Sequence, residues 1–213
     1  MDSPYHIQLC QEGLGTKFST RVLQIITSAN IRQDGIFTGL VGHPEYHFDS
    51  DKFKESKAYI QSQRKIIYAS LEDDSKSKLA WEAFGQLLHA AQDYYAHSNY
   101  VRLWAERYHP DDLPAIESFN GLNPSLLTHP DLISCKVYYP FEAITYFPRM
   151  RPFARKFLPA DSHANMNLDD PGRGPLFPFA MAGSRQATTL ELDTLLENIP
   201  TDLHARFFGY SSK

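Results

Sequence analysis

The stretch from residue 84 to residue 101 constrains the fold most, because it is apolar or aromatic on almost every helical face yet carries three evenly spaced polar side chains. His89, Asp93 and His97 follow one another at intervals of four residues, and this spacing aligns side chains along one stripe of an α-helix. A helix that is apolar nearly all round is typically buried. The sequence therefore predicts a buried central helix, from about residue 75 to residue 108, with a stripe of ligand-type side chains inside the protein.

The rest of the chain also favours helices. Apolar residues recur at helical spacing in three further segments, 16–30, 50–71 and 177–199, and no alternating pattern predicts a strand. Between residues 109 and 159, eight prolines exclude a long helix, whereas the high aromatic content argues against disorder. The sequence therefore predicts an all-α fold, a helical bundle around the central helix with a Pro- and aromatic-rich loop region.

Length and charge limit the possible architectures and partners. A chain of 213 residues can bury one substantial core, so we expect one zinc-binding helical domain over residues 1–213, with loose ends at 1–14 and 207–213. The net charge of -4, with scattered Lys and Arg, argues against nucleic acid as a partner. No apolar run approaches the roughly 20 residues that span a bilayer.

The start of the chain and its cysteines bear on location. The first residues have no basic region followed by an apolar one, which argues against a secretory leader. Only two cysteines are present, Cys10 and Cys135, too few and too far apart for a disulfide framework, and we expect both to be small buried side chains. These features predict a cytoplasmic protein with a small-molecule substrate, and they leave the oligomeric state open.

The polar stripe has the chemistry of a metal site. Imidazole and carboxylate groups are zinc ligands, and a pair four residues apart on a helix can chelate one ion. Helical rise separates His89 from His97 by about 12 Å along the axis, so a regular helix cannot direct both at the same ion. Either Asp93 bridges two ions, or the helix unwinds at His97 and a single site forms. A hydrogen-bonded stripe without metal is the third interpretation.

Further ligand types cluster in two predicted loops. His47 and Asp49 lie in the first loop, where Asp49 could equally cap the helix that follows. His163 lies in the second loop, in the segment DSHANMNLDDPGRG. We expect one or two Zn²⁺ ions, with Asp93 or Asp49 as the catalytic base. The expected metal ligands are His47, Asp49, His89, Asp93, His97 and His163.

Other candidates receive a simpler interpretation. His6 and His204 lie near the ends of the chain and are expected to be solvated, whereas His109 and His129 each precede proline and are expected in turns. Gly85 lies on the stripe side one turn before His89, where the missing side chain could leave room for a ligand. Glycine costs about 1 kcal/mol there relative to alanine, so it needs such a reason.

Two motifs carry a family resemblance. GQLLHAAQDYYAHSNYV and DSHANMNLDDPGRG resemble the Het-C group of proteins, related to the helical fold of zinc-dependent phospholipase C and P1-type nucleases. The resemblance extends over roughly residues 35–198 and implies that His89 and Asp93 bind zinc, with Asp93 able to bridge. It also implies that the other four expected ligands face the metal.

This sequence departs from the phospholipase pattern in two ways. Those enzymes use a processed N-terminal amine as a zinc ligand, and this chain shows no leader whose removal would expose one. Asn167, a poor ligand, stands four residues after His163 where that pattern has glutamate. One or two metal ions are therefore expected rather than three.

The resemblance also suggests an activity. In size and organisation the chain is similar to small fungal cyclopenases of alkaloid biosynthesis, which implies a zinc-dependent lyase. Such enzymes convert a cyclopenin benzodiazepinedione to a viridicatin-type quinolone with loss of methyl isocyanate. The aromatic segment 138–157 would suit a flat substrate, although core packing explains it equally well.

Three other functions remain open from the sequence. A metal-dependent phosphodiesterase of the phospholipase C type would need positive charge near the stripe, and no Lys or Arg follows it before Arg102. A structural zinc domain usually takes Cys-rich ligands. A non-catalytic interaction protein of the Het-C type is the last alternative.

Overall fold

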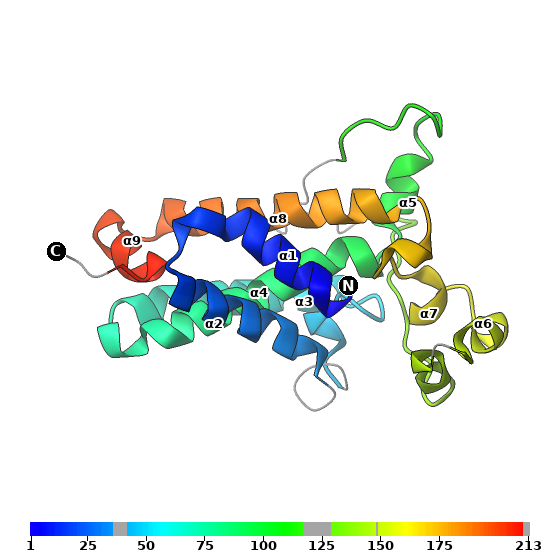
Figure 1. The fold of residues 1–213 in the computed structure, drawn as a ribbon, viewed down its shortest axis with the longest axis horizontal. Helices are drawn as coiled ribbons and strands as arrows, with labels where there is room; N and C mark the ends of the chain where they lie inside the picture. Colours follow the sequence, from blue (N-terminus) through cyan, green and yellow to red (C-terminus); the bar gives the residue numbers. More distant parts are fainter. Residues whose placement is uncertain (36–41, 117–128, 148, 211–213) are drawn as a thin grey trace.

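The computed structural model is helical over the part of the chain that it describes, and Figure 1 shows the arrangement. Within that part there is no strand, and isolated bridges join Ser98 to Ser134 and Lys136 to Ser162. The all-α prediction is therefore confirmed. No helix described is both long and apolar enough to cross a membrane. The structure describes residues 1–35, 42–116, 129–147 and 149–210.

The core surrounds α4 (Ser77–His97), which is buried over most of its length. It packs against α2 (Thr20–Ile31) and α3 (Phe53–Leu71) on two sides and against α8 (Phe177–Asn198) on a third. Helix α1 (Ser3–Leu14) lies across α2 and α8 (Figure 1). Each of these helices buries an apolar face against α4 or its neighbours, which is the dominant favourable contribution to folding.

Close helix packing explains Gly85. A Cβ atom there would overlap the carbonyl oxygen of Ile26 and lie 2.9 Å from the Cβ of Ala29 and 3.0 Å from the backbone nitrogen of Asn30. The space beside Gly85 is therefore filled by the backbone of α2. The expectation that it leaves room for a ligand is wrong, because helix packing uses that space.

The central helix is shorter than the sequence predicts. Helix α4 ends at His97, Ser98 is extended, and a short helix α5 (Tyr100–Ala105) follows. The break is stabilised by the segment near Ser134, because the backbone N–H of Asn99 donates to the carbonyl of Ile133 at 3.0 Å. This long-range pairing has no signal in the local apolar pattern.

Short elements occupy the proline-rich region, as the sequence predicts. The 3-10 helix η6 (Phe141–Tyr146) and the α-helices α6 (Arg151–Ala154) and α7 (His163–Met166) extend from one end of the bundle (Figure 1). The large side chains of this region are exposed: 81% for Tyr139, 66% for Phe141 and 73% for Phe157. Core packing is therefore the wrong explanation for these three.

Both chain ends differ from the prediction that they are loose. At the start, Ser3–Leu14 forms α1, with Leu9 and Cys10 fully buried and Met1 buried as well. At the end, Thr201–Phe208 forms α9, and Phe207 is fully buried against Phe18 and Phe84. The prediction is wrong for these residues because long-range packing orders them, and residues 211–213 lie outside the described part. Cys135 is buried like Cys10, as expected of both.

Candidate metal centre

The stripe on α4 forms the floor of the site. Asp93 lies between the two histidines, with its Oδ2 atom 3.0 Å from Nε2 of His89 and 4.0 Å from Nδ1 of His97. All three side chains are buried. Because α4 stays helical through His97, the helix does not unwind before that residue. The carboxylate of Asp93 therefore faces both histidines from a regular helix.

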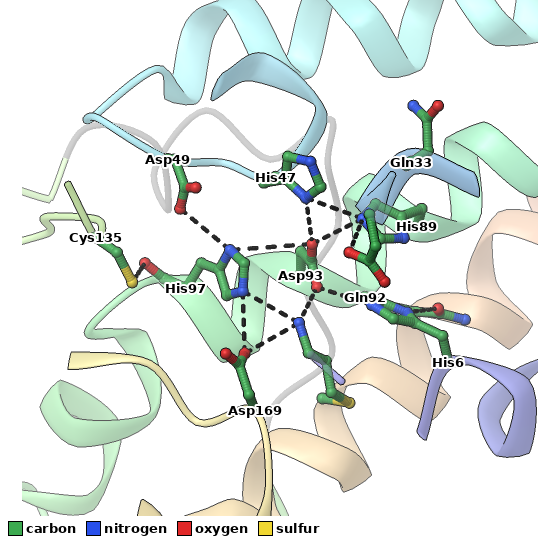
Figure 2. Close-up of polar contacts among 12 residues, drawn as sticks. His6, Gln33, His47, Asp49, His89, Gln92, Asp93, His97, Cys135 and Asp169 are labelled. Atoms are coloured by element: carbon green, nitrogen blue, oxygen red, sulfur yellow. Dashed lines mark hydrogen bonds and ion pairs between the residues drawn. The ribbon is translucent and has the colours of Figure 1, made fainter. Parts of the chain in front are cut away.

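His47 completes a triangle with two of these residues. It follows the 3-10 helix η4 (Pro44–Tyr46), and its Nδ1 atom lies 2.9 Å from Oδ2 of Asp93 and 3.0 Å from Nε2 of His89. With the 3.0 Å between His89 and Asp93, the three edges are nearly equal. Ligand atoms about 2.0 Å from a tetrahedral zinc ion lie about 3.3 Å from one another. The triangle therefore has close to the spacing of metal ligands (Figure 2).

A second group surrounds His97. Its Nδ1 atom lies 3.1 Å from Oδ1 of Asp49, and its Nε2 atom lies 3.1 Å from Oδ1 of Asp169. The Nε2 atom of His163 lies 3.4 Å from Nε2 of His97 and 3.6 Å from Oδ2 of Asp169. Asp49 does not cap α3, whose N-cap residue is Lys52. The structure therefore brings all six expected ligands into two adjoining groups.

Three acidic or basic side chains were missed as candidates from the sequence. His6 is fully buried, with Nε2 3.1 Å from Oδ1 of Asp93, so the expectation that it is solvated is wrong. Oδ1 of Asp34 lies 3.5 Å from Nε2 of His89, and Asp169 touches His97. Signals existed for two of them: Asp169 lies in the same ligand-rich segment as His163, and Leu9 and Cys10 follow His6 at helical spacing and mark one buried face.

The amino group of Met1 lies inside the site, contrary to expectation. Its nitrogen is 2.6 Å from Oδ1 of Asp93, 3.1 Å from Oδ1 of Asp169 and 3.1 Å from Nε2 of His97. Burial lowers the pKa of this group, but the Asp169 and Asp93 carboxylates outweigh burial and raise it to about 12. A cation therefore sits between the two groups of ligands in this structure.

The surroundings set the charge of several side chains in the centre. Burial lowers the pKa of both His89 and His163 to about 4, so these imidazoles are neutral near pH 7. Burial raises the pKa of Asp93 and Asp169, but the Met1 ammonium and His97 hold both well below the usual range. Neutral imidazole and ionised carboxylate are the forms in which these side chains bind metals. His97 differs: burial and the Met1 ammonium lower its pKa, but the Asp93, Asp49 and Asp169 carboxylates outweigh them and raise it well above the usual value, so a metal ion would have to displace its proton.

Several buried ligand atoms have no hydrogen-bond partner among the described residues. They are Nε2 of His6, Nε2 of His47, Oδ1 of Asp49 and Nδ1 of His97. A buried polar atom without a partner costs about 1–3 kcal/mol, and such atoms are rare in folded proteins. Nε2 of His6 lies 3.1 Å from Oδ1 of Asp93, and Nδ1 of His97 lies 3.1 Å from Oδ1 of Asp49, so these atoms approach charged groups without hydrogen-bond geometry, as neighbouring ligands of one ion do. Nε2 of His47 is not the atom that faces the triangle, which is Nδ1.

A polar network behind the centre orients the imidazoles. Nδ1 of His6 lies 2.6 Å from Oε1 of Gln92, and Nδ1 of His89 lies 3.3 Å from Oδ1 of Asn30. Asn30 donates to the same oxygen of Gln92 at 3.0 Å, and Gln92 donates to Thr188 at 2.9 Å. If each Nδ1 carries the proton, each Nε2 lone pair faces Asp93 and the centre. Partners of this kind fix ring orientation in metal sites.

The centre is reached through a cavity. It has a volume of about 190 Å³ and opens at the surface. Among the described side chains of segment 138–157, no aromatic one lines this cavity, so the described part of the structure does not place a flat aromatic wall at the site. The cavity is lined by Met1, Asp2, Ser3, Asp34, His47, His97, Thr145, Arg151, His163, Asp169 and Arg173.

Comparison with known proteins identifies the family. The family model of the VWA7 N-terminal domain matches residues 3–123, more than half of the 213-residue chain. The chain belongs to the VWA7 N-terminal domain family. The matched part contains the α4 stripe together with His6 and His47, whereas His163 and Asp169 lie beyond it. No solved structure matches the chain.

Relatives within this family are much longer proteins. Human von Willebrand factor A domain-containing protein 7 is 34% identical over 86 residues, which make up 40% of this chain and 9% of that protein. The rat and mouse proteins of the same name are each 31% identical over 101 residues, 45% of this chain and 11% of theirs. The matched segment therefore spans about a tenth of the length of these relatives.

The family assignment shows that the resemblance inferred from the two motifs is wrong. The chain is a VWA7-type domain rather than a Het-C protein or a cyclopenase. Three expectations based on that resemblance are therefore wrong: the cyclopenase reaction in alkaloid biosynthesis, the phospholipase C-like activity and the Het-C-type interaction role. The physical reason is that His and Asp four residues apart on a buried helix describe a type of metal site, and a type of site does not specify a family.

Proposed function

We propose that this domain binds zinc at the His/Asp centre and acts as a zinc-dependent enzyme on a small-molecule substrate. The observation that carries the proposal is the close approach of buried histidine nitrogens and carboxylate oxygens beside an open cavity that His47, His97, His163 and Asp169 line. Structural zinc sites are closed by four protein ligands, whereas catalytic sites keep a position open. The cavity supplies such an opening beside His47, His97 and His163.

One or two ions can be accommodated. The first position lies within the triangle of His47, His89 and Asp93. The second lies beside His97, where Asp169 and His163 offer further ligand atoms and where an ion would displace the Met1 ammonium. Asp93 could serve both positions, because its Oδ2 atom faces the triangle and its Oδ1 atom faces His6 and Met1.

The reaction class that we propose is that of a lyase. Zinc would polarise a substrate oxygen as a Lewis acid and lower the pKa of water at the site. We propose Asp49 as the base, because its buried Oδ1 atom lies 3.1 Å from Nδ1 of His97, and His97 lines the cavity. Asp93 is the alternative base, and its contacts with three histidines favour a ligand role instead.

The proposal is tested first by metal content. Protein purified without chelator should contain one or two equivalents of zinc by elemental analysis, and Asp93→Ala should lower that number. His204→Ala is the control, because His204 bonds to the carbonyl of Ile199, far from the centre in sequence and absent from its contacts. Wild-type protein without stoichiometric transition metal would refute the proposal.

Catalysis is tested by turnover of small carbonyl compounds that raise the melting temperature. Turnover followed by NMR should stop with chelator and return with zinc, and Asp49→Asn should slow it on the order of 100-fold with zinc retained. Product formed in ¹⁸O-labelled water should carry no label if the enzyme is a lyase, whereas label would indicate a hydrolase. Turnover that persists after zinc is removed would exclude zinc catalysis.

A further inference from the structure

Two arginines line the cavity and have no part in the expected metal centre. Arg151 begins α6, and Arg173 ends the 3-10 helix η8 (Pro171–Arg173). Both line the same cavity as His97 and His163. In the sequence they lie 54 and 76 residues after His97 (151 − 97 and 173 − 97). Local sequence patterns therefore gave no reason to place positive charge beside the stripe.

Each guanidinium is held by backbone oxygen atoms. Nε of Arg151 donates to the carbonyl of Thr145 at 3.0 Å, and Nη1 of Arg173 donates to the carbonyl of Ala164 at 2.7 Å. Carbonyls fix the orientation of a guanidinium but do not neutralise it. A guanidinium carries five N–H donors, so each arginine keeps further donors beyond these bonds. Both arginines are thus positioned as cations at the cavity.

Acidic neighbours oppose this charge, since Asp34 and Asp169 line the cavity as well. Asp170 lies 3.4 Å from Nε of Arg173, and Asp2 lines the same cavity. A third cation, Arg155, lies nearby, and its pKa is lowered by burial and by the charges of Arg173 and Arg151. Like charges that repel one another are stabilised by a nearby anion, and Arg151 and Arg173 are the two of these arginines that line the cavity.

We propose that Arg151 and Arg173 form a subsite for an anionic group of the substrate, a carboxylate or a phosphate, beside the metal centre. The inference rests on the proposed function, because zinc would offset the negative charge of Asp93 and Asp169, which otherwise repels an anion. Planar guanidinium groups match the oxygens of both ligand types and can bind them through two parallel hydrogen bonds. One end of the substrate would then contact the arginines and the other end the centre.

The test measures anion binding to zinc-loaded protein at fixed ionic strength. Calorimetric titration with inorganic phosphate and with benzoate separates the two possible sources of the anionic group. Arg151→Gln and Arg173→Gln should each weaken binding of the preferred anion on the order of 10-fold, with zinc content unchanged. Arg149→Gln is the matched control, because Arg149 is exposed, carries the same charge and does not line the cavity.

The outcomes separate this inference from the proposed function. Zinc-loaded wild type that binds neither anion, or variants that bind as tightly as wild type, would refute the arginine subsite alone. Wild type that holds no zinc would refute the proposed function and the subsite together. Arg151→Gln decides the case if Arg173→Gln unfolds, because Arg173 also bonds to Ala164 and Asp170.

Discussion

Replacing Gly85 by alanine tests whether helix packing and the metal centre are coupled. The added Cβ would overlap the carbonyl oxygen of Ile26 and crowd Ala29 and Asn30. The obstacle is backbone, so a rotamer change cannot relieve it and α2 must move away from α4. Asn30 would move with α2, and its Oδ1 atom lies 3.3 Å from Nδ1 of His89. Stability and zinc affinity should therefore fall together.

The magnitude follows from two opposing effects. Alanine gains about 1 kcal/mol over glycine in a helix interior. Overpacking a close contact costs about 1–3 kcal/mol, and more when backbone has to shift. Because the overlap here is with backbone, we expect a net loss of about 1–2 kcal/mol. For a domain of this size that corresponds to a melting temperature lower by about 2–8 °C.

Thermal unfolding of metal-free protein measures the packing effect, and zinc titration of the folded variant measures the coupling. Leu79→Ala is the control, since Leu79 lies on α4 with half of its surface exposed and should change stability by no more than about 0.5 kcal/mol. A Gly85→Ala variant as stable as wild type would show that α2 does not pack as described. Lower stability with unchanged zinc affinity would refute the coupling through Asn30.

Other substitutions test separate parts of the structure. Gln92→Leu removes the hydrogen-bond acceptor of His6 and of Asn30. Zinc affinity, measured by competition with a chromogenic chelator, should therefore fall about 10–100-fold. An unchanged affinity would show that this network does not orient the ligands. In the wild type, Arg64 donates two hydrogen bonds to Glu191 at 2.6 Å and 3.1 Å. Arg64→Met leaves the Glu191 carboxylate buried without this partner, so the free energy of unfolding at pH 7, measured with denaturant, should fall by about 3–5 kcal/mol. Burial raises the pKa of Glu191, although Arg64 lowers it. The loss of stability should therefore become smaller as pH falls and the carboxyl is protonated, and the double variant Arg64→Met/Glu191→Leu should recover most of the lost stability. A loss that stays constant with pH would refute the explanation.

The α4 stripe could be predicted from sequence because its cause is local. Spacing by four residues places His89, Asp93 and His97 on one face whatever the surrounding fold is. His47 and Asp49 could be predicted in part, since a loop rich in ligand types has few structural roles. Whether these two side chains contact the stripe depends on the path of the chain before α3, and no local sequence pattern specifies that path.

The missed residues depend on long-range packing. His6 reaches Asp93 because α1 lies across α2 and α8, and Arg173 lines the cavity because η8 packs near α8 and the guanidinium bonds to the carbonyl of Ala164. Local sequence propensities do not predict either arrangement. The family assignment failed for a different reason, since the motifs used for it describe metal chemistry that several folds can share.

The ligand groups come from segments that meet only after the chain has folded. His6, Asp34, His47, the α4 stripe and His163 belong to five stretches of sequence, and apolar side chains other than these pack between α2, α3, α4 and α8. We therefore expect apolar packing to bring the helices together and a metal ion to bind afterwards, rather than to act as the nucleus of folding. An ion would enter a cavity that already exists and could be exchanged there without unfolding. The identity of the bound metal would then depend on which ions are available to the folded protein, and not on which ions were present while it folded.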